Sequence, residues 1–550
     1  MTRRLLVVGV DGLPPALLRQ LIAEERMPNF ARLTEAGSLG VLRSTPNYQS
    51  ASAWTSLVTG VNPGRHGVIN FTNPVRGSYD FVQIDARARR APTIWRILSD
   101  ADVRVAALNI PVSYPAEQVE GVMVSGWLCP SPATEGFTYP AELAGWLADE
   151  VGDYPIHPDV RRHAAAGDYL TVARLARRGI RVKLEVARRI FERENPDVLC
   201  AVVTETDSLQ HWCWHLLDSE HPEHDAGLAI RWREELLSVY SALDDALGQL
   251  LSAVGESADV LIVSDHGQAP NSGGQVLLRR WLVDRGYLVP QPRPSVQRLI
   301  DACTRVGFEA IRRHAGNRLK SRLRSRFPRL QRRAQRGMSG IAADWPRTRA
   351  WTEGGHVYVN TRGTWPEGCV DPDAERPGLL DELREGLLDL RDADSGERAV
   401  ASVSLGSEQF EGRESDLMPD LLVHWRNDLR VTRLQDGCGA IIQRPGAPEL
   451  PLGAHHPDGT LITCGPSFSP VEQPTPHSIY DVAPTLLHFF DRPVPEYFDG
   501  QVMTDLMTPE AREGVQCAAV NVPSVEHDPG SRVADDEIIT RRLRSLGYVE

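Results

Sequence analysis

The stretch RLLVVGVDG, residues 4–12, decides the fold, because its six-residue apolar run leads directly into Asp11 and Gly12. The run is far shorter than the ~20 residues of a membrane span. It is also not followed by the small-residue cleavage site of a secretory signal. We therefore expect a buried first β-strand in a cytoplasmic protein.

Similar short runs recur along the chain and alternate with helical patterns. The runs rich in Val, Ile and Leu, typical of buried parallel strands, are residues 103–110, 197–206 and 258–265. Helical spacing of apolar residues is found at 27–37, 93–102 and 159–194. The alternation predicts an α/β fold with a mostly parallel central sheet sandwiched by helices.

Three of the predicted strands end at an aspartate or lead directly into one, namely Asp11, Asp207 and Asp265. Functional groups gather at the carboxyl ends of the strands in open α/β sheets. We therefore expect the three carboxylates at one edge of the sheet.

Length and composition set the outer limits. The 550 residues allow two domains, or one large core with insertions. A formal net charge of −13 argues against nonspecific nucleic-acid binding by the whole molecule. The eight cysteines are scattered without a CxxC pair, which indicates reduced thiols and no thiolate metal site.

Residues 293–336 differ from the remainder, with fourteen Arg or Lys side chains against two acidic ones. The pattern predicts a basic amphipathic helix that is broken at Pro328. We expect this segment to be an insertion between core elements that acts as a cap or docking element. Two interpretations stay open: a surface for anionic substrate, nucleic acid or membrane, and a solvated helical pair. The predicted organisation is a first core part at 1–290, the insertion at 291–345, a second core part at 346–508 and a tail at 509–550.

Metal-binding side chains gather near the predicted strand ends. Asp207 and His211 are four residues apart and share one face of a helix. Asp265 and His266 are adjacent, and a turn at Gly267 would bring both inward. Imidazole with carboxylate suits zinc, iron or manganese. Each pattern alone also fits a solvated helix face or a turn with a capping aspartate.

The segment NYQSASAWTSLVTG, residues 47–60, places five Ser or Thr side chains beside one tryptophan. Ser50 and Ser52 precede or begin a helix-like run, so each is a candidate nucleophile. Each is equally suited as the N-cap of that helix.

Together these motifs resemble the alkaline phosphatase superfamily, in its type I phosphodiesterase/nucleotide pyrophosphatase-like branch. They extend from residue 4 to about residue 500 and leave out the basic insertion. The motifs are VVGVDGL, MPNFARLTEAG, QSASAWTSLVTGVNPGRHGVINF, DSLQHWCW, VSDHG, GAHHPDGTLITCGP and SIYDVAPTLLHFFDRPVPEYFDG.

The resemblance implies two divalent metal ions per chain, with zinc expected before manganese or iron. One ion would be held by Asp207, His211 and His455. The other would be held by Asp11, Asp265 and His266, with Ser50 as its further ligand. His456 is the rival of His455, and the family spacing after Gly453 favours His455.

The resemblance also places the nucleophile on Ser50, which would serve as the helix N-cap as well. Ser52 stays the alternative nucleophile. Where nucleotide pyrophosphatases carry an asparagine three residues after the nucleophile, this chain has Ala53. We therefore expect the backbone N–H groups of Ala51 and Ser52 to bind the phosphate.

The implied activity is hydrolysis of a small anionic phosphate ester, of phosphodiesterase or nucleotide pyrophosphatase type, through a covalent phospho-Ser50. The alternatives are a phosphomonoesterase of the same superfamily and a non-hydrolytic binder of phosphorylated partners. Sulfatases are excluded because Ser50 does not begin a C/S-x-P-x-R signature. Phosphonoacetate hydrolases use active-site lysines, and the two lysines, Lys183 and Lys320, lie outside the motifs.

Overall fold

The computed structural model describes residues 3–291, 343–443 and 450–518. Its centre is a nine-stranded sheet in the order β20-β2-β19-β9-β1-β8-β5-β6-β7. The strands are β1 (Leu5–Val10), β2 (Ser38–Arg43), β5 (Val105–Leu108), β6 (Gly121–Val124), β7 (Thr138–Tyr139), β8 (Val198–Val203), β9 (Asp259–Val263), β19 (Asp458–Cys464) and β20 (His477–Ser478).

The five central strands, β9, β1, β8, β5 and β6, are parallel to one another. β19 runs antiparallel between β9 and β2, and β7 is antiparallel to β6. The prediction of an α/β fold with a mostly parallel sheet is therefore confirmed. The four strands expected from apolar runs are β1, β5, β8 and β9.

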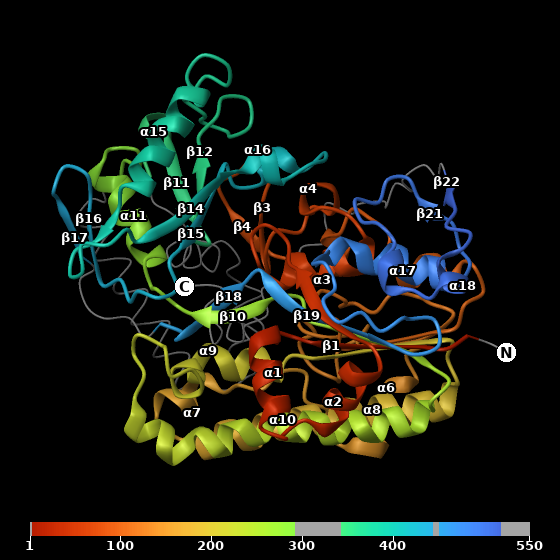
Figure 1. Cartoon of the computed structure of the whole chain (residues 1–550). Coiled ribbons are helices and arrows are strands. Elements are labelled where there is room, and N and C mark those ends of the chain that lie inside the picture. Colours follow the sequence, from red (N-terminus) through yellow and green to blue (C-terminus); the bar gives the residue numbers. More distant parts are fainter. Residues whose placement is uncertain (1–2, 292–342, 444–449, 519–550) are drawn as a thin grey trace, which may run out of the picture.

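Helices cover both faces of this sheet (Figure 1). On one face lie α1 (Pro15–Ala23), α2 (Pro28–Ala36), α8 (Tyr169–Glu194), α9 (Glu205–Leu217) and α10 (Ala226–Val254). On the other face lie α3 (Ser50–Thr59), α5 (Ile94–Ser99) and α17 (Val482–Phe489).

The sequence of β1 shows why both faces need helices. Leu6, Val8 and Val10 belong to one hydrophobic cluster, whereas Leu5 and Val7 belong to the cluster on the opposite face. Successive side chains of a strand point to opposite faces. An uninterrupted apolar strand therefore requires an apolar layer on each side.

A second lobe has its own hydrophobic cluster and lies beyond one end of the central sheet (Figure 1). Its antiparallel sheet has the order β11-β12-β15-β14, and its smaller sheet has the order β13-β16-β17. Its elements are α11 (Gln275–Asp284), β11 (Ala350–Glu353), β12 (His356–Val359), α15 (Arg376–Leu388), β13 (Arg391–Asp392), β14 (Val400–Leu405), β15 (Leu421–Trp425), β16 (Arg433–Gln435) and β17 (Ile441–Gln443).

The basic stretch 293–336 lies outside the described residues, and so does the tail after residue 518. The predicted bounds of the four segments stay predictions. Within the described ranges, no helix combines the length and apolar character that a membrane span requires.

Candidate active site

The candidate site lies at the carboxyl ends of three neighbouring strands. Asp11 directly follows β1, and Asp207 lies in the first turn of α9, which begins two residues after β8. Asp265 and His266 lie between β9 and β10 (Gly267–Pro270). Because β9, β1 and β8 are adjacent in the sheet, their ends bring these side chains together.

A two-stranded ribbon adds the last histidine. β10 pairs antiparallel with β18 (Gly453–His456), which places Gln268 opposite His455. The imidazole of His455 stacks on that of His266, with ring centroids 3.6 Å apart. His455 thus enters the site through strand pairing, although it is 189 positions away from His266 in the sequence.

The first group of ligand atoms comprises Asp207, His211 and His455, as the resemblance implied. Nε2 of His211 lies 3.0 Å from Nε2 of His455 and 3.2 Å from Oδ1 of Asp207. Nε2 of His455 lies 3.5 Å from the same carboxylate oxygen. The three atoms face one another closely enough to share one cation.

The second group differs in one member from the implied set. It comprises Asp11, His266 and Asp207, so the Asp207 carboxylate belongs to both groups. Nε2 of His266 lies 3.4 Å from Oδ1 of Asp11 and 3.5 Å from Oδ2 of Asp265. Asp265 therefore lies next to this group, while Asp207 joins it from α9.

Each of the three histidines uses its other ring nitrogen in a hydrogen bond to a backbone carbonyl. Nδ1 of His211 donates to Gly453, and Nδ1 of His266 donates to Gly267. Nδ1 of His455 donates to the carbonyl of Tyr48. Such bonds fix the tautomer and leave Nε2 as a lone-pair donor to a metal.

The carboxylates provide the test of whether a cation fits. Three carboxylates of the site are almost completely buried, and each keeps one oxygen without a hydrogen bond among the described residues. These oxygens are Oδ1 of Asp11, Oδ1 of Asp207 and Oδ2 of Asp265. A buried carboxylate oxygen without a partner is costly. Divalent cations are the partners that such oxygens and imidazoles bind, so these residues fit metal ions.

The electrostatics of the site agree with this conclusion. Burial and the charge of Asp11 raise the pKa of Asp265 well above its usual range. Burial opposes protonation of His266, yet Asp265 and Asp11 raise its pKa to about 10. The carboxylates of the site therefore create a negative field that a divalent cation would neutralise.

Asp207 behaves differently from its two neighbours. Burial would raise its pKa, but the adjacent imidazoles of His211 and His455 hold the pKa well below the usual range. Its carboxylate is thus the one of the three whose ionised form the site favours.

Ser50 lies at the edge of the second group. Its Oγ is 3.0 Å from Nε2 of His266, and the residue is completely buried. The expected N-cap role is wrong: Gln49 is the N-cap, and Ser50 is the first helical residue of α3. The chain becomes helical one residue earlier because Gln49, with extended backbone and without a side-chain cap, already accepts the hydrogen bond from Ala53.

The rival hydroxyl points into the preceding loop. Oγ of Ser52 lies 2.8 Å from Oδ1 of Asn47 and 2.9 Å from the carbonyl oxygen of Gln49. Ala51 and Ser52 occupy the first turn of α3, where backbone N–H groups have no acceptor within the helix. Their expected role in binding phosphate stays a prediction.

The rival histidine also lies outside both groups. His456 follows His455 on β18, where successive side chains point in opposite directions. Its Nδ1 accepts a hydrogen bond from the N–H of Asp458. Gly267 opposite it does not form the expected turn; it begins β10, where a Cβ would lie 2.2 Å from the carbonyl oxygen of Asp458.

Two residues next to the ligands on α9 hold this helix against the end of β1, and sequence patterns gave no sign of them. Oγ1 of Thr206 donates to the carbonyl of Asp11, and Nε2 of Gln210 donates to that of Gly12. Gly12 has a φ of +69°, and a Cβ there would approach Asp207 to 3.2 Å. Close approach of α9 to β1 thus depends on glycine at position 12.

Lys183 lies nearer to the ligands than its place in the sequence indicated. Its ammonium is 2.8 Å from Oε1 of Glu205, and both side chains are at most 1% exposed. Glu205 begins α9, two residues before Asp207. Packing of α8 against α9 brings the two together, so this buried pair supports the helix that carries the ligands.

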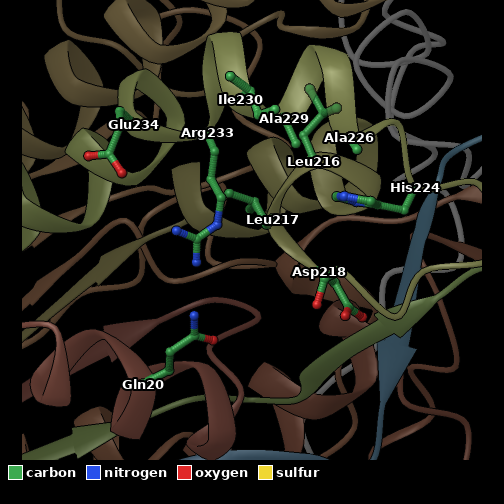
Figure 2. A pocket seen from close by; sticks show the side chains of 11 residues that line it. Gln20, Leu216, Leu217, Asp218, His224, Ala226, Ala229, Ile230, Arg233 and Glu234 are labelled. Carbon is green, nitrogen blue, oxygen red and sulfur yellow. The ribbon is translucent and has the colours of Figure 1, made fainter.

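A cavity of about 440 Å³ lies at the opposite end of α9 and does not include any predicted site residue (Figure 2). Its lining includes Leu216, Asp218, His224, Ile230 and Arg233. A much smaller cavity, of about 20 Å³, borders Asn47 and Gln49 beside the start of α3. It has room for about one water molecule.

Residues 5–426 match the sequence profile of the type I phosphodiesterase / nucleotide pyrophosphatase family. None of the curated proteins matches the sequence. The phosphonoacetate hydrolase of Sinorhizobium meliloti 1021, solved with phosphonoformate, is 17% identical with a TM-score of 0.52, over 88% of this chain and 94% of that chain. Murine ectonucleotide pyrophosphatase / phosphodiesterase 5 is 12% identical with a TM-score of 0.47, over 92% of this chain and 100% of that chain.

The match to the phosphonoacetate hydrolase shows a shared fold. The family is shown by the profile, which covers β1, β8 and β9, the aspartates that follow them and α3. The chain therefore belongs to the type I phosphodiesterase / nucleotide pyrophosphatase family of phosphoester hydrolases, within the alkaline phosphatase superfamily.

Proposed function

We propose that this protein hydrolyses phosphodiesters or pyrophosphates with Ser50 as the nucleophile, at a site that holds two divalent cations. The observation that carries the proposal is the position of Ser50: its Oγ lies 3.0 Å from Nε2 of His266, at the edge of a group of buried carboxylates with unsatisfied oxygens. A hydroxyl in such a place is activated by its surroundings and not merely buried.

Asp207, His211 and His455 would hold one cation, and Asp11, Asp265 and His266 would hold the other; the Asp207 carboxylate belongs to both candidate groups. When bound, the cations lower the pKa of a coordinated hydroxyl and neutralise charge on phosphate oxygens. Zinc suits this set of imidazole and carboxylate ligands, with manganese or iron as alternatives.

Ser50 attacks the phosphorus atom. Its Oγ gives its proton to solvent and forms an O–P bond, while the ester P–O bond on the opposite side breaks and the leaving group departs with the electron pair of that bond. The position of Ser50 in the first turn of α3 favours negative charge on Oγ, because the N-terminus of a helix is positive. The N–H groups of Ala51 and Ser52 donate to a nonbridging phosphate oxygen.

A water molecule then cleaves the phosphoryl–Ser50 bond and regenerates the hydroxyl. The three Nδ1–H groups, each bound to a backbone carbonyl, keep the imidazoles in one tautomer through both steps. The rigid ligands thereby hold the reacting atoms in line.

The test is turnover of bis-p-nitrophenyl phosphate with and without a chelator. We expect the activity to disappear on metal removal and to return when Zn²⁺ or Mn²⁺ is added back. Equal turnover with and without the chelator would overturn the proposal, and so would the absence of turnover in fully metal-loaded protein.

A further inference from the structure

Trp54 connects the nucleophile helix to a carboxylate of the site. It lies four residues after Ser50 on α3, so both side chains lie on the same face of the helix. Its Nε1 donates a hydrogen bond of 3.0 Å to Oδ2 of Asp11. The ring is completely buried, at 0% exposure.

The centre of β1 is shaped to admit this ring. Gly9 occupies the fifth position of the strand, where a Cβ would lie 2.4 Å from Cη2 of Trp54 and 2.8 Å from Cγ2 of Val202. Glycine inside a strand is unfavourable and often marks a close approach. The indole therefore reaches Asp11 across a strand position that only glycine can occupy.

The hydrogen bond divides the two oxygens of Asp11 between two tasks. Oδ2 accepts from Trp54, whereas Oδ1 faces Nε2 of His266 at 3.4 Å and accepts no hydrogen bond from the described residues. An N–H on one oxygen fixes the rotation of the carboxylate and thus the direction of the other oxygen. Partners of this kind orient metal ligands.

We propose that Trp54 is a positioning residue that turns Oδ1 of Asp11 toward the cation of the second group and holds Ser50 in register with it. This inference rests on the proposed function, because it assigns Trp54 a role toward the same cation. It also gives a physical reason for tryptophan at this position: phenylalanine would keep an apolar ring there but could not donate a hydrogen bond.

The chain provides a matched control. Trp95 lies on α5 in the same hydrophobic cluster as Trp54 and is 1% exposed. Its Nε1 finds no hydrogen-bond acceptor in the described part of the chain. Trp95→Phe therefore removes a similar volume from the same core without removing a hydrogen bond.

The experiment compares Zn²⁺ affinity of the full chain, Trp54→Phe and Trp95→Phe by competition with a chromophoric chelator. We expect Trp54→Phe to bind one of two ions about 10- to 100-fold more weakly, the usual cost of losing a partner of a metal ligand. Trp95→Phe should bind both ions as the unmodified chain does. Equal affinities in both variants would overturn the inference.

A second variant separates the hydrogen bond from packing. Benzothienylalanine at position 54 keeps the bicyclic shape and replaces the N–H by sulfur, so it preserves the core if Trp54→Phe fails to fold. This variant should bind one of the two Zn²⁺ ions as weakly as Trp54→Phe does, and unchanged affinity for both ions would contradict the role of Trp54. If the unmodified chain binds no divalent ion, the proposed function fails instead, which distinguishes the two.

Discussion

The hydroxyl of Ser50 and the imidazole of His266 meet at 3.0 Å although 216 residues separate them in the sequence. Three features of the fold create this contact. β9 ends beside β1, α3 packs on the opposite face of the sheet from α9, and Asp11 lies between Trp54 and His266. The proposed nucleophile and the candidate cation ligands are thus placed by the core of the fold.

Loss of His455 should remove one ion from the protein. Elemental analysis should give close to two divalent ions per chain for the unmodified protein and close to one for His455→Ala. Its ring nitrogen lies 3.0 Å from that of His211. His456→Ala is the matched control, because its side chain lies outside both ligand groups. Loss of an ion from His456→Ala, or none from His455→Ala, would contradict the assignment.

Diesters should be better substrates than monoesters. A monoester carries one more negative charge, which a further cationic side chain would have to bind. The arginines nearest to Ser50 in sequence are engaged elsewhere: Arg43 with Asp458 at 2.6 Å and Arg65 with Asp499 at 3.0 Å.

A missing charge-assisted hydrogen bond corresponds to about 10- to 100-fold in kcat/KM. The preference is measured as the ratio of kcat/KM for bis-p-nitrophenyl phosphate to kcat/KM for p-nitrophenyl phosphate. A preference for the monoester would show that an arginine from another part of the chain reaches the site.

The buried pair of Lys183 and Glu205 should be important for stability. Lys183→Met leaves the Glu205 carboxylate buried without its cation, which costs about 3–5 kcal/mol of unfolding free energy. The double variant Lys183→Met/Glu205→Gln should recover most of this loss, because no buried charge is left. Urea unfolding measures both, and a single variant as stable as the unmodified chain would show that the pair is dispensable.

Acid should destabilise the protein partly through His66. Its imidazole is completely buried, accepts from the N–H of Val68 at Nδ1 and lies 2.9 Å from Oγ of Ser56. Burial, with the charge of Arg89, lowers its pKa from 6.5 to about 3.

The unfolded chain therefore takes up this proton first as the pH falls. The stabilisation is complete above pH 6.5 and is lost between pH 6.5 and pH 3. Between pH 7 and pH 5 this amounts to about 2 kcal/mol. In urea unfolding, the free energy of unfolding of His66→Gln should fall by about 2 kcal/mol less between pH 7 and pH 5 than that of the unmodified chain. An equal fall in both proteins would contradict the prediction.

Much of the fold could be predicted from the sequence because its strands are short apolar runs that end at Asp11, Asp207 or Asp265. The antiparallel pairing of β19 and the assembly of the second lobe could not be predicted, because pairing between distant segments leaves no local pattern. The resemblance brought together ligands from four separate segments that spacing alone would not have joined.

Other features depend on contacts in space. Trp54, Gly9, Thr206 and Gln210 support the site through a hydrogen bond or a close approach, and no periodicity or motif marks such contacts. The shared position of Asp207 has the same origin, since it depends on how α9 is held against β1. The start of α3 was misplaced by one residue because Gln49 caps it without a side-chain hydrogen bond.

The central claim is that Ser50 carries the phosphoryl group, and trapping that intermediate tests it most directly. Metal-loaded protein is mixed with bis-p-nitrophenyl phosphate, quenched in acid within one turnover, digested and analysed by mass spectrometry. The account predicts a p-nitrophenyl phosphoryl adduct on Ser50, no adduct in Ser50→Ala, and turnover in that variant reduced at least about 100-fold. An adduct on Ser52, or Ser50→Ala with undiminished turnover, would contradict it.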